Sequence, residues 1–175
     1  MANYAVAAKE LADYTLCTED AVVQGFEGTL HLKDRLCSLE LTILNYTPYT
    51  LRYSGVYFDS GTSYYDACAQ ILPEKGCSWF VANKQGGILT GVTGGAKYSI
   101  VGSENLSLYV GFCNPAIGSF KHFASVQHDG FSANYGYDQC QDDDIKHFSE
   151  NGFALTVEKA ESKIAHRRFI YTISK

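Results

Sequence analysis

A cluster of hydroxyl, carboxylate and glycine residues follows one alternating segment of the chain. Residues 51–58 alternate apolar and polar side chains, and Asp-Ser-Gly-Thr-Ser at positions 59–63 follows directly. Clusters of this kind end strands. This one, centred on Ser60, would place hydroxyls and backbone amides at the rigid end of a sheet, which suits a polar or anionic headgroup. The alternative interpretation is an ordinary strand-to-loop turn.

Other residues at predicted strand ends or loops could complete such a pocket. The group consists of Ser60, Thr93, Pro115, Tyr135 and Tyr137. Tyrosine rings around a polar pocket hold a quaternary ammonium through cation–π contact. We therefore expect these positions to converge on one end of the fold.

The sequence contains none of the common catalytic or metal-binding patterns. GxSxG, HExxH, P-loop and dinucleotide-binding motifs are missing, and the histidines have no Ser or Cys partner in a motif. The run Asp142–Asp144 with His147 lacks EF-hand spacing, whereas acidic residues favour the first turn of a helix. We expect a short helix near residues 142–149, and a protein that is not an enzyme and needs no cofactor or metal ion.

Composition limits the possible partners. Hydrophobic residues make up 46% of the chain and charged residues 19%, which is typical of a globular protein. The net charge of −5 argues against nucleic acid and against binding driven by anionic lipid alone. A membrane role would depend on headgroup recognition and aromatic insertion, for which 13 Tyr and 10 Phe supply the rings.

The cysteines bear on the compartment. Six cysteines without a CxxC pair argue against zinc and favour a secreted, disulfide-bearing protein over a cytosolic one. Their spacing selects none of the possible pairings. No apolar run approaches the ~18 residues of a spanning helix. No signal peptide is visible, so the chain is either intracellular or given in processed form.

Period-two alternation dominates from residue 36 onward. Strands are predicted over residues 36–43, 51–58, 78–81, 88–92, 96–101, 105–112, 120–126, 153–157 and 169–173. Thr93-Gly94-Gly95 is interpreted as a hairpin turn, and residues 2–16 have the apolar spacing of a helix. The pattern predicts one domain over 1–175: a mostly β sandwich over 36–175, flanked by short helices and preceded by an N-terminal segment over 1–35.

Several short motifs occur in an order and at separations that match one known family. They are Val56-Tyr57-Phe58-Asp59-Ser60-Gly61-Thr62-Ser63, Leu72-Pro73, Thr90-Gly91-Val92, Leu106 to Phe112 with Pro115, and Ile173-Ser174-Lys175. On these residues the chain resembles the actinoporins, the sea-anemone pore-forming cytolysins, and their actinoporin-like relatives. The resemblance implies an actinoporin-like β-sandwich that is secreted, binds phosphocholine lipids such as sphingomyelin, self-oligomerises on the target-cell membrane and inserts an N-terminal helix.

The resemblance also implies roles for single residues. The implied headgroup contacts are Ser60, Thr93, Cys113, Pro115, Tyr135 and Tyr137. Phe120 and Phe123 fall where the family keeps the aromatic residues of its membrane-facing loop. The chain departs from the family at Thr93, where a valine is expected, at Cys113, where a serine is expected, and at Lys121, where a tyrosine is expected. Its acidic balance and its six cysteines are further departures.

A second function belongs to a different class. The same sandwich resembles the fungal fruit-body lectins, which bind glycans and carry no inserting helix. The weak apolar face of residues 2–16 favours the lectin hypothesis, whereas Ser60 and Pro115 favour the pore former. A structural or interaction role is the third possibility.

Overall fold

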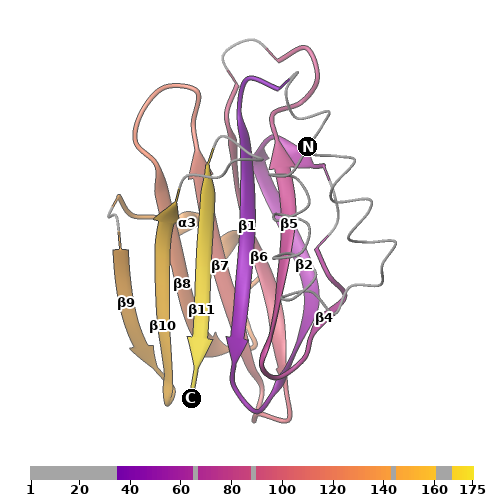
Figure 1. The fold of residues 1–175 in the computed structure, drawn as a ribbon, viewed down its shortest axis with the longest axis vertical. Coiled ribbons are helices and arrows are strands. Elements are labelled where there is room, and N and C mark those ends of the chain that lie inside the picture. Colours follow the sequence, from indigo (N-terminus) through magenta and orange to yellow (C-terminus); the bar gives the residue numbers. More distant parts are fainter. Residues whose placement is uncertain (1–34, 65–66, 88–89, 143–144, 161–166) are drawn as a thin grey trace, which may run out of the picture.

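The computed structural model describes residues 35–64, 67–87, 90–142, 145–160 and 167–175. Within them the strands form two sheets that pack face to face, which confirms the predicted mostly β sandwich (Figure 1). Sheet A lies in front in Figure 1, and sheet B lies behind it. Residues 2–16, where a helix is predicted, lie outside the described residues.

Sheet A contains six strands in the order β3-β5-β1-β11-β10-β9. Their bounds are Ser38–Tyr46 for β1, Thr62–Ser63 for β3, Lys75–Ala82 for β5, Ile145–Glu150 for β9, Phe153–Ala160 for β10 and Arg168–Ser174 for β11. Strands β1 and β11 are parallel, and the other neighbouring strands are antiparallel.

Sheet B contains five strands in the order β4-β2-β6-β7-β8, and all neighbours are antiparallel. Their bounds are Thr50–Ser60 for β2, Gln70–Ile71 for β4, Val92–Val101 for β6, Leu106–Asn114 for β7 and Lys121–His128 for β8. The short helix α3, Asn134–Asp138, packs against the outer face of β6 and β7. We call the end where β2, β5 and β7 finish the upper end, as it is oriented in Figure 1.

The core lies between the two sheets and follows the alternation of the sequence. In β1, Leu39, Leu41 and Ile43 are fully buried on the inner face. Trp79 of sheet A contacts Tyr98 of sheet B, with ring centroids 6.1 Å apart. Side chains that alternate along a strand point to opposite faces, so the period-two pattern predicted the buried face correctly.

The helix predicted near residues 142–149 is wrong. Residues Ile145–Glu150 form strand β9, which pairs along its length with β10. Asp142 lies in no helix, and its carboxylate accepts a hydrogen bond from Lys159 of β10 at 2.9 Å. Pairing with a neighbouring strand has overridden the local preference of the acidic run. The helix of the described residues is α3, Asn134–Asp138, which ends before Asp142.

The turn predicted at Thr93-Gly94-Gly95 is also wrong, because β6 runs straight through these residues. Gly94 and Gly95 allow the backbones of neighbouring segments to approach β6 closely. A Cβ atom on Gly94 would lie 2.2 Å from the Tyr57 carbonyl oxygen, and one on Gly95 would lie 2.3 Å from the Ala133 carbonyl oxygen. Glycine within a strand is typical of such contacts.

One disulfide joins Cys68 to Cys77. Among the other described residues, Cys37, Cys113 and Cys140 are free thiols. In the part of the chain that the structure describes, no helix is long and apolar enough to cross a membrane.

Candidate functional site

Four residues form a row across the upper end of sheet B. Ser60 of β2 lies opposite Thr93 of β6, Thr93 lies opposite Cys113 of β7, and Cys113 lies opposite Lys121 of β8. Residues directly opposite in a sheet share a face. The sequence therefore predicted three members of this row, Ser60, Thr93 and Cys113, and the sheet register brings them together.

An extra residue in β2 adds a carboxylate to the row. The register shifts between Phe58 and Ser60, so both Asp59 and Ser60 stand opposite Thr93. The Thr93 hydroxyl donates a hydrogen bond to Asp59 Oδ2 at 3.3 Å, and the Tyr137 hydroxyl donates another to the same carboxylate. The Asp59 carboxylate is thus held over β6 on the outer face of sheet B.

Two tyrosine rings stand beside this carboxylate. Tyr57 of β2 and Tyr137 of α3 have ring centroids 5.9 Å apart. Tyr57 is 38% exposed, and Tyr137 is half-buried. Two rings and a carboxylate, open to solvent on one side, are suited to a cation.

The hydroxyl of Ser60 is engaged within the protein. It donates to the carbonyl oxygen of Gly91 at 3.0 Å. Gly91 in turn abuts Pro115, since a Cβ atom on Gly91 would lie 2.5 Å from the Pro115 Cα atom. Ser60 and Pro115 therefore bracket the same segment and shape the upper end, and the Ser60 oxygen keeps its acceptor capacity.

Glycines on neighbouring strands allow α3 to sit directly on the sheet. A Cβ atom on Gly111 would lie 1.9 Å from the Gly136 carbonyl oxygen, and Gly95 faces α3 in the same way. Lys97 also anchors the segment before α3, because its ammonium donates to the Phe131 carbonyl oxygen at 2.9 Å and pairs with Asp129. These contacts fix the position of Tyr137.

Tyr135 belongs to a different cluster. Its ring stacks on Phe131 at 4.5 Å and contacts Tyr109 at 5.3 Å and Phe123 at 5.9 Å. Residues two apart in a helix point to nearly opposite sides. Tyr137 therefore reaches Asp59, whereas Tyr135 lies over the middle of sheet B and does not converge with the row at the upper end.

The two phenylalanines assigned to a membrane-facing loop are placed differently. Phe123 lies within β8 and is 7% exposed. Phe120 is half-buried, with the Arg167 guanidinium 3.4 Å above its ring and Phe169 5.9 Å away. Neither ring projects from an exposed loop tip, so the aromatic loop implied by the resemblance is not formed by these residues.

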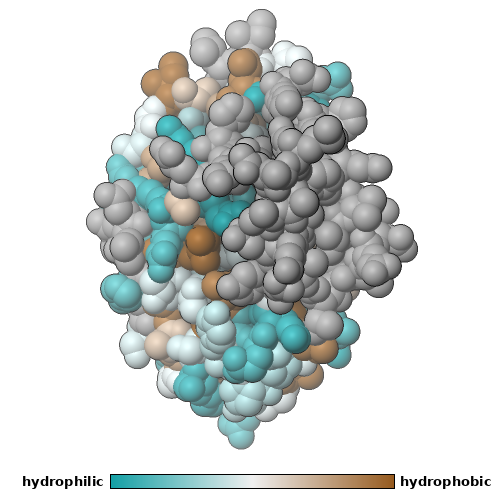
Figure 2. Space-filling view, viewed as in Figure 1, coloured by the Kyte–Doolittle hydropathy of each residue, from teal (hydrophilic) through white to brown (hydrophobic). Residues whose placement is uncertain are grey.

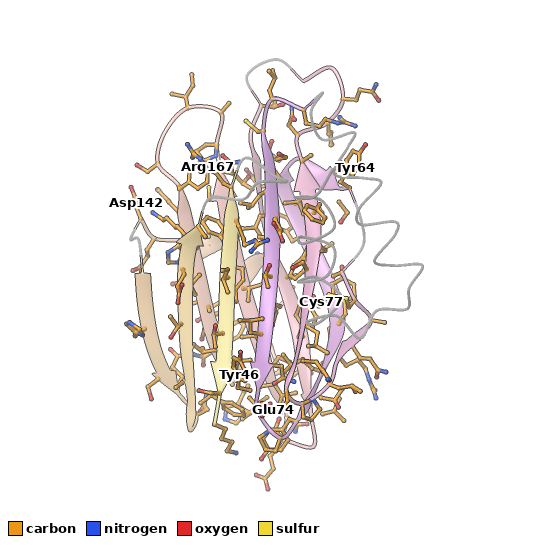
Figure 3. All side chains as sticks on the ribbon, in the orientation of Figure 1. Tyr46, Tyr64, Glu74, Cys77, Asp142 and Arg167 are labelled. Carbon is orange, nitrogen blue, oxygen red and sulfur yellow. A yellow bond between two sulfur atoms is a disulfide. The ribbon has the colours of Figure 1, made fainter. Side chains whose placement is uncertain are left out.

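The most exposed apolar side chains at the upper end are aliphatic. Ile117, in the loop between β7 and β8, is 80% exposed, and Leu36, before β1, is 71% exposed. Figure 2 shows hydrophobic surface at this end beside hydrophilic surface. Figure 3 places Arg167 toward the same end and Tyr46 at the opposite one.

Burial raises the pKa values of the tyrosine and the thiols around the row. It raises the pKa of Tyr137 to about 12, aided by the hydrogen bond to Asp59. Burial also raises the pKa of the Cys113 thiol, against the effect of Lys121, and that of the Cys140 thiol. Asp59 and Lys121 are the charged residues of the row itself, and the pKa of the exposed Asp142 is lowered by hydrogen bonds from Ser119 and Lys159 and also by Lys121.

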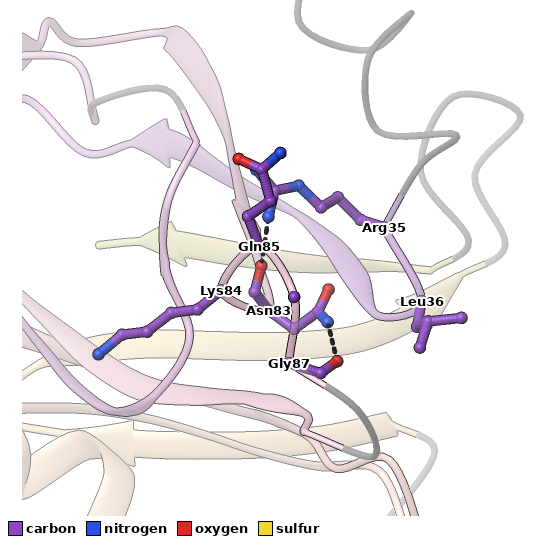
Figure 4. A pocket seen from close by; sticks show the side chains of 7 residues that line it. Arg35, Leu36, Asn83, Lys84, Gln85 and Gly87 are labelled. Atoms are coloured by element: carbon purple, nitrogen blue, oxygen red, sulfur yellow. Dashed lines mark hydrogen bonds between the residues drawn. The ribbon is translucent and has the colours of Figure 1, made fainter.

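A separate cavity of about 210 Å³ lies beside the turn after β5 (Figure 4). Its lining consists of Arg35, Leu36, Asn83, Lys84, Gln85, Gly86 and Gly87. Arg35 donates to the Asn83 carbonyl oxygen at 3.1 Å, and the Asn83 amide donates to the Gly87 carbonyl oxygen at 3.3 Å. This lining shares no residue with the row on sheet B. The described residues contain no group of three or more His, Cys, Asp or Glu side chains that could hold a metal ion.

Asp59 and Tyr57 were not predicted as ligand contacts, and Lys121 was predicted only to differ from the tyrosine expected in the family. Tyr57 and Asp59 stand next to Ser60 in the motif that predicted the corner. The position of Asp59 between Tyr57 and the predicted pocket residue Ser60 was the sequence signal that could have identified both residues as ligand contacts.

Comparison with known proteins places the fold. No protein-family profile matches the chain, and no curated protein sequence matches it. Among solved structures, the lipid binding protein Nakanori superposes with a TM-score of 0.70 at 14% identity, over 96% of this chain and 86% of that one. At this identity the likeness concerns the fold alone, and it agrees with the two-sheet sandwich.

Other solved structures are less similar. The lectin XCL of Xerocomus chrysenteron has a TM-score of 0.43 at 13% identity, over 78% of this chain and 99% of that one. The RahU protein has a TM-score of 0.47 at 7% identity, over 81% and 96%. These two likenesses are too low to support an argument about this chain.

Proposed function

We propose that this chain is a membrane-binding protein, not an enzyme, and that it recognises phosphocholine-type lipid headgroups at the upper end of sheet B. One observation carries the proposal: the Tyr57 and Tyr137 rings lie 5.9 Å apart beside the Asp59 carboxylate. A cation over aromatic faces gains about 0.5–2 kcal/mol. The actinoporin resemblance and the fold shared with a lipid-binding protein support the same class of ligand.

The exposed aliphatic side chains at the upper end would support docking of the protein onto a membrane. Ile117 and Leu36 project from the upper end, and full burial of such a side chain contributes about 1.5–3 kcal/mol. Lys84 and Lys121 are exposed at this end and would face lipid phosphates. Headgroup capture and shallow insertion would then act together.

We extend the proposal to pore formation. In it, sphingomyelin is the preferred lipid, and bound chains self-oligomerise into a cytolytic pore after secretion. The Cys68–Cys77 disulfide supports an oxidising compartment. Crossing ~30 Å of hydrocarbon takes about 20 helical residues, so the segment after Cys17 would have to join residues 2–16.

Dye-loaded vesicles test both headgroup binding and pore formation. Calcein release and co-sedimentation should be measured on phosphatidylcholine vesicles with and without sphingomyelin. We expect the full chain to bind and release dye, and a variant lacking residues 2–16 to bind without release. Release by the truncated variant at the full rate would remove the pore mechanism. Binding to immobilised glycans without binding to any vesicle would replace the proposal with the lectin hypothesis.

A further inference from the structure

The row at the upper end of sheet B carries opposite charges on either side of one thiol. Cys113 of β7 lies between Asp59, held over β6 by the Thr93 hydroxyl, and Lys121, its direct partner on β8. Burial is the main cause of the raised pKa of the Cys113 thiol; of the two charges, Lys121 lowers this pKa and Asp59 raises it. Within the described ranges, neither Asp59 nor Lys121 forms an ion pair.

We propose that Asp59 and Lys121 form a dipolar cradle that fixes the orientation of a zwitterionic headgroup. In this cradle the ammonium group lies against Asp59, Tyr57 and Tyr137, and the phosphate lies toward Lys121, with Cys113 beneath the linker between them. The inference rests on the proposed function and adds the orientation of the ligand and the two residues that select for its charges.

Distance and reach allow this arrangement. Neighbouring strands lie about 4.8 Å apart, so the carboxylate over β6 and the lysine on β8 are separated by roughly 10 Å across the sheet. The lysine side chain is a flexible four-carbon stem that can lean toward β7 and shorten this separation. The ordinary pKa of a thiol lies above 7, and burial raises that of Cys113 further, so the neutral Cys113 thiol between them opposes neither charge.

The reverse orientation is disfavoured at both ends. A phosphate next to Asp59 would meet a like charge and the negative faces of the Tyr57 and Tyr137 rings. An ammonium next to Lys121 would meet a like charge without an aromatic ring. An anionic headgroup such as that of phosphatidylserine places a carboxylate beside its ammonium, which Asp59 would repel. The cradle therefore selects an ammonium joined to a single phosphate, without a neighbouring carboxylate.

Competition with the two halves of the headgroup tests the orientation. Binding of the full chain to phosphatidylcholine–sphingomyelin vesicles should be displaced by choline chloride and, separately, by inorganic phosphate. In Asp59→Asn, the inhibition constant of choline, corrected for the variant's own vesicle affinity, should rise about two- to fivefold, the contribution of an exposed ion pair, and the corrected inhibition constant of phosphate should not change. In Lys121→Gln, the corrected inhibition constant of phosphate should rise by a similar factor, and that of choline should not change.

Matched controls separate charge from structure. Glu104→Gln makes the same charge change as Asp59→Asn at an exposed turn between β6 and β7, at the opposite end, and should leave both competitions unchanged. Asp59→Lys should lose phosphatidylcholine binding and gain binding to phosphatidylserine vesicles. Calorimetry with soluble phosphocholine distinguishes recognition of the headgroup from recognition of the lipid surface, and the same crossed pattern is expected in both.

The possible outcomes distinguish failure of the proposed headgroup binding from failure of the proposed cradle. If the unaltered chain binds neither the vesicles nor soluble phosphocholine, the proposed function fails, and this inference fails with it. If the chain binds but both variants change both competitions equally, or neither changes either, the cradle is wrong and the proposed function stands. Thermal unfolding of each variant identifies a loss of binding that is due to misfolding, and Asp59→Glu, which keeps the charge, should then restore choline competition.

Discussion

The hydroxyl of Thr93 donates a hydrogen bond to the carboxylate of Asp59 across 3.3 Å, from one strand of sheet B to the next. Thr93 is 7% exposed, so its role is to hold the carboxylate in place beneath any ligand. The tyrosines of the site converge on this carboxylate from β2 and α3. Position 93 therefore affects binding through the orientation of a charge.

Removing this hydrogen bond should weaken binding without unfolding the protein. We expect Thr93→Val, which keeps the shape of the side chain, to weaken binding to phosphocholine vesicles by about two- to tenfold, equivalent to about 0.5–1.5 kcal/mol. Co-sedimentation titrations measure the change. Thr50→Val, at the opposite end of sheet B, is the control and should bind normally. Unchanged binding in Thr93→Val would mean that Asp59 needs no support from β6.

The two tyrosines of α3 should separate in function. Tyr137 contacts Asp59 and Tyr57, so Tyr137→Ala should weaken phosphocholine binding by about 0.5–2 kcal/mol. Tyr135 stacks on Phe131, so Tyr135→Ala should lower thermal stability with a smaller effect on binding. Titration and thermal unfolding of both variants check this. A larger binding defect in Tyr135→Ala would place the headgroup over the middle of the sheet instead.

The close contact between α3 and β7 should depend on Gly111. In Gly111→Ala the new Cβ atom would lie 1.9 Å from the Gly136 carbonyl oxygen, so α3 must shift. We expect a loss of about 1–3 kcal/mol in the free energy of unfolding, together with weaker vesicle binding, because the helix carries Tyr137. Urea denaturation and co-sedimentation measure the two effects. Gly130→Ala, where a Cβ atom would meet nothing within 4 Å, should be neutral in both.

The ion pair that anchors the segment before α3 should depend on pH. The hydrogen bond from Lys97 lowers the pKa of Asp129, and the hydrogen bond to Asp129 raises the pKa of Lys97. The stabilisation linked to Asp129 is present above its unfolded pKa of about 3.9 and is lost as pH falls through the lowered pKa. The stabilisation linked to Lys97 is present below about pH 10.4 and is lost as pH rises through the raised pKa.

A lysine variant tests this pH dependence. Lys97→Met should be less stable than the unaltered chain by about 0.2–1 kcal/mol near pH 7, a value that allows for solvent screening of an exposed pair. The difference should shrink as pH falls through the lowered pKa of Asp129. Urea titrations at pH 7 and at a series of acidic pH values measure it. A difference of equal size at every acidic pH would assign the effect to the hydrogen bond from Lys97 to the Phe131 carbonyl oxygen alone.

The disulfide should stabilise the fold. Cys68 and Cys77 are nine residues apart, and closing a loop of this kind typically contributes about 2–4 kcal/mol. Dithiothreitol should therefore lower the free energy of unfolding of the unaltered chain by this amount. It should have no effect on the double variant Cys68→Ala/Cys77→Ala. A loss of stability of the double variant in reductant would point to a disulfide formed by another cysteine of the chain.

The sequence by itself determined which residues face the core. Alternation in residues such as Leu39, Leu41 and Ile43 predicts a half-buried strand, because successive side chains of a strand point to opposite faces whatever the partner strand. The same local signal predicted the corner after Phe58 and thus the upper end of β2. The positions of Ser60, Thr93 and Cys113 followed from motifs and resemblance, and the register aligned them.

Tertiary structure decided everything that depends on contact between distant segments. Residues 145–150 became a strand because β10 offers an edge to pair with, and Gly94 and Gly95 lie inside β6 because other backbones approach them closely. The different positions of the Tyr135 and Tyr137 rings likewise depend on how α3 packs against Gly111. Local sequence carries the period of an element, but it does not carry the partner that satisfies the hydrogen bonds or fills the space beside that element, and only the folded chain supplies that partner.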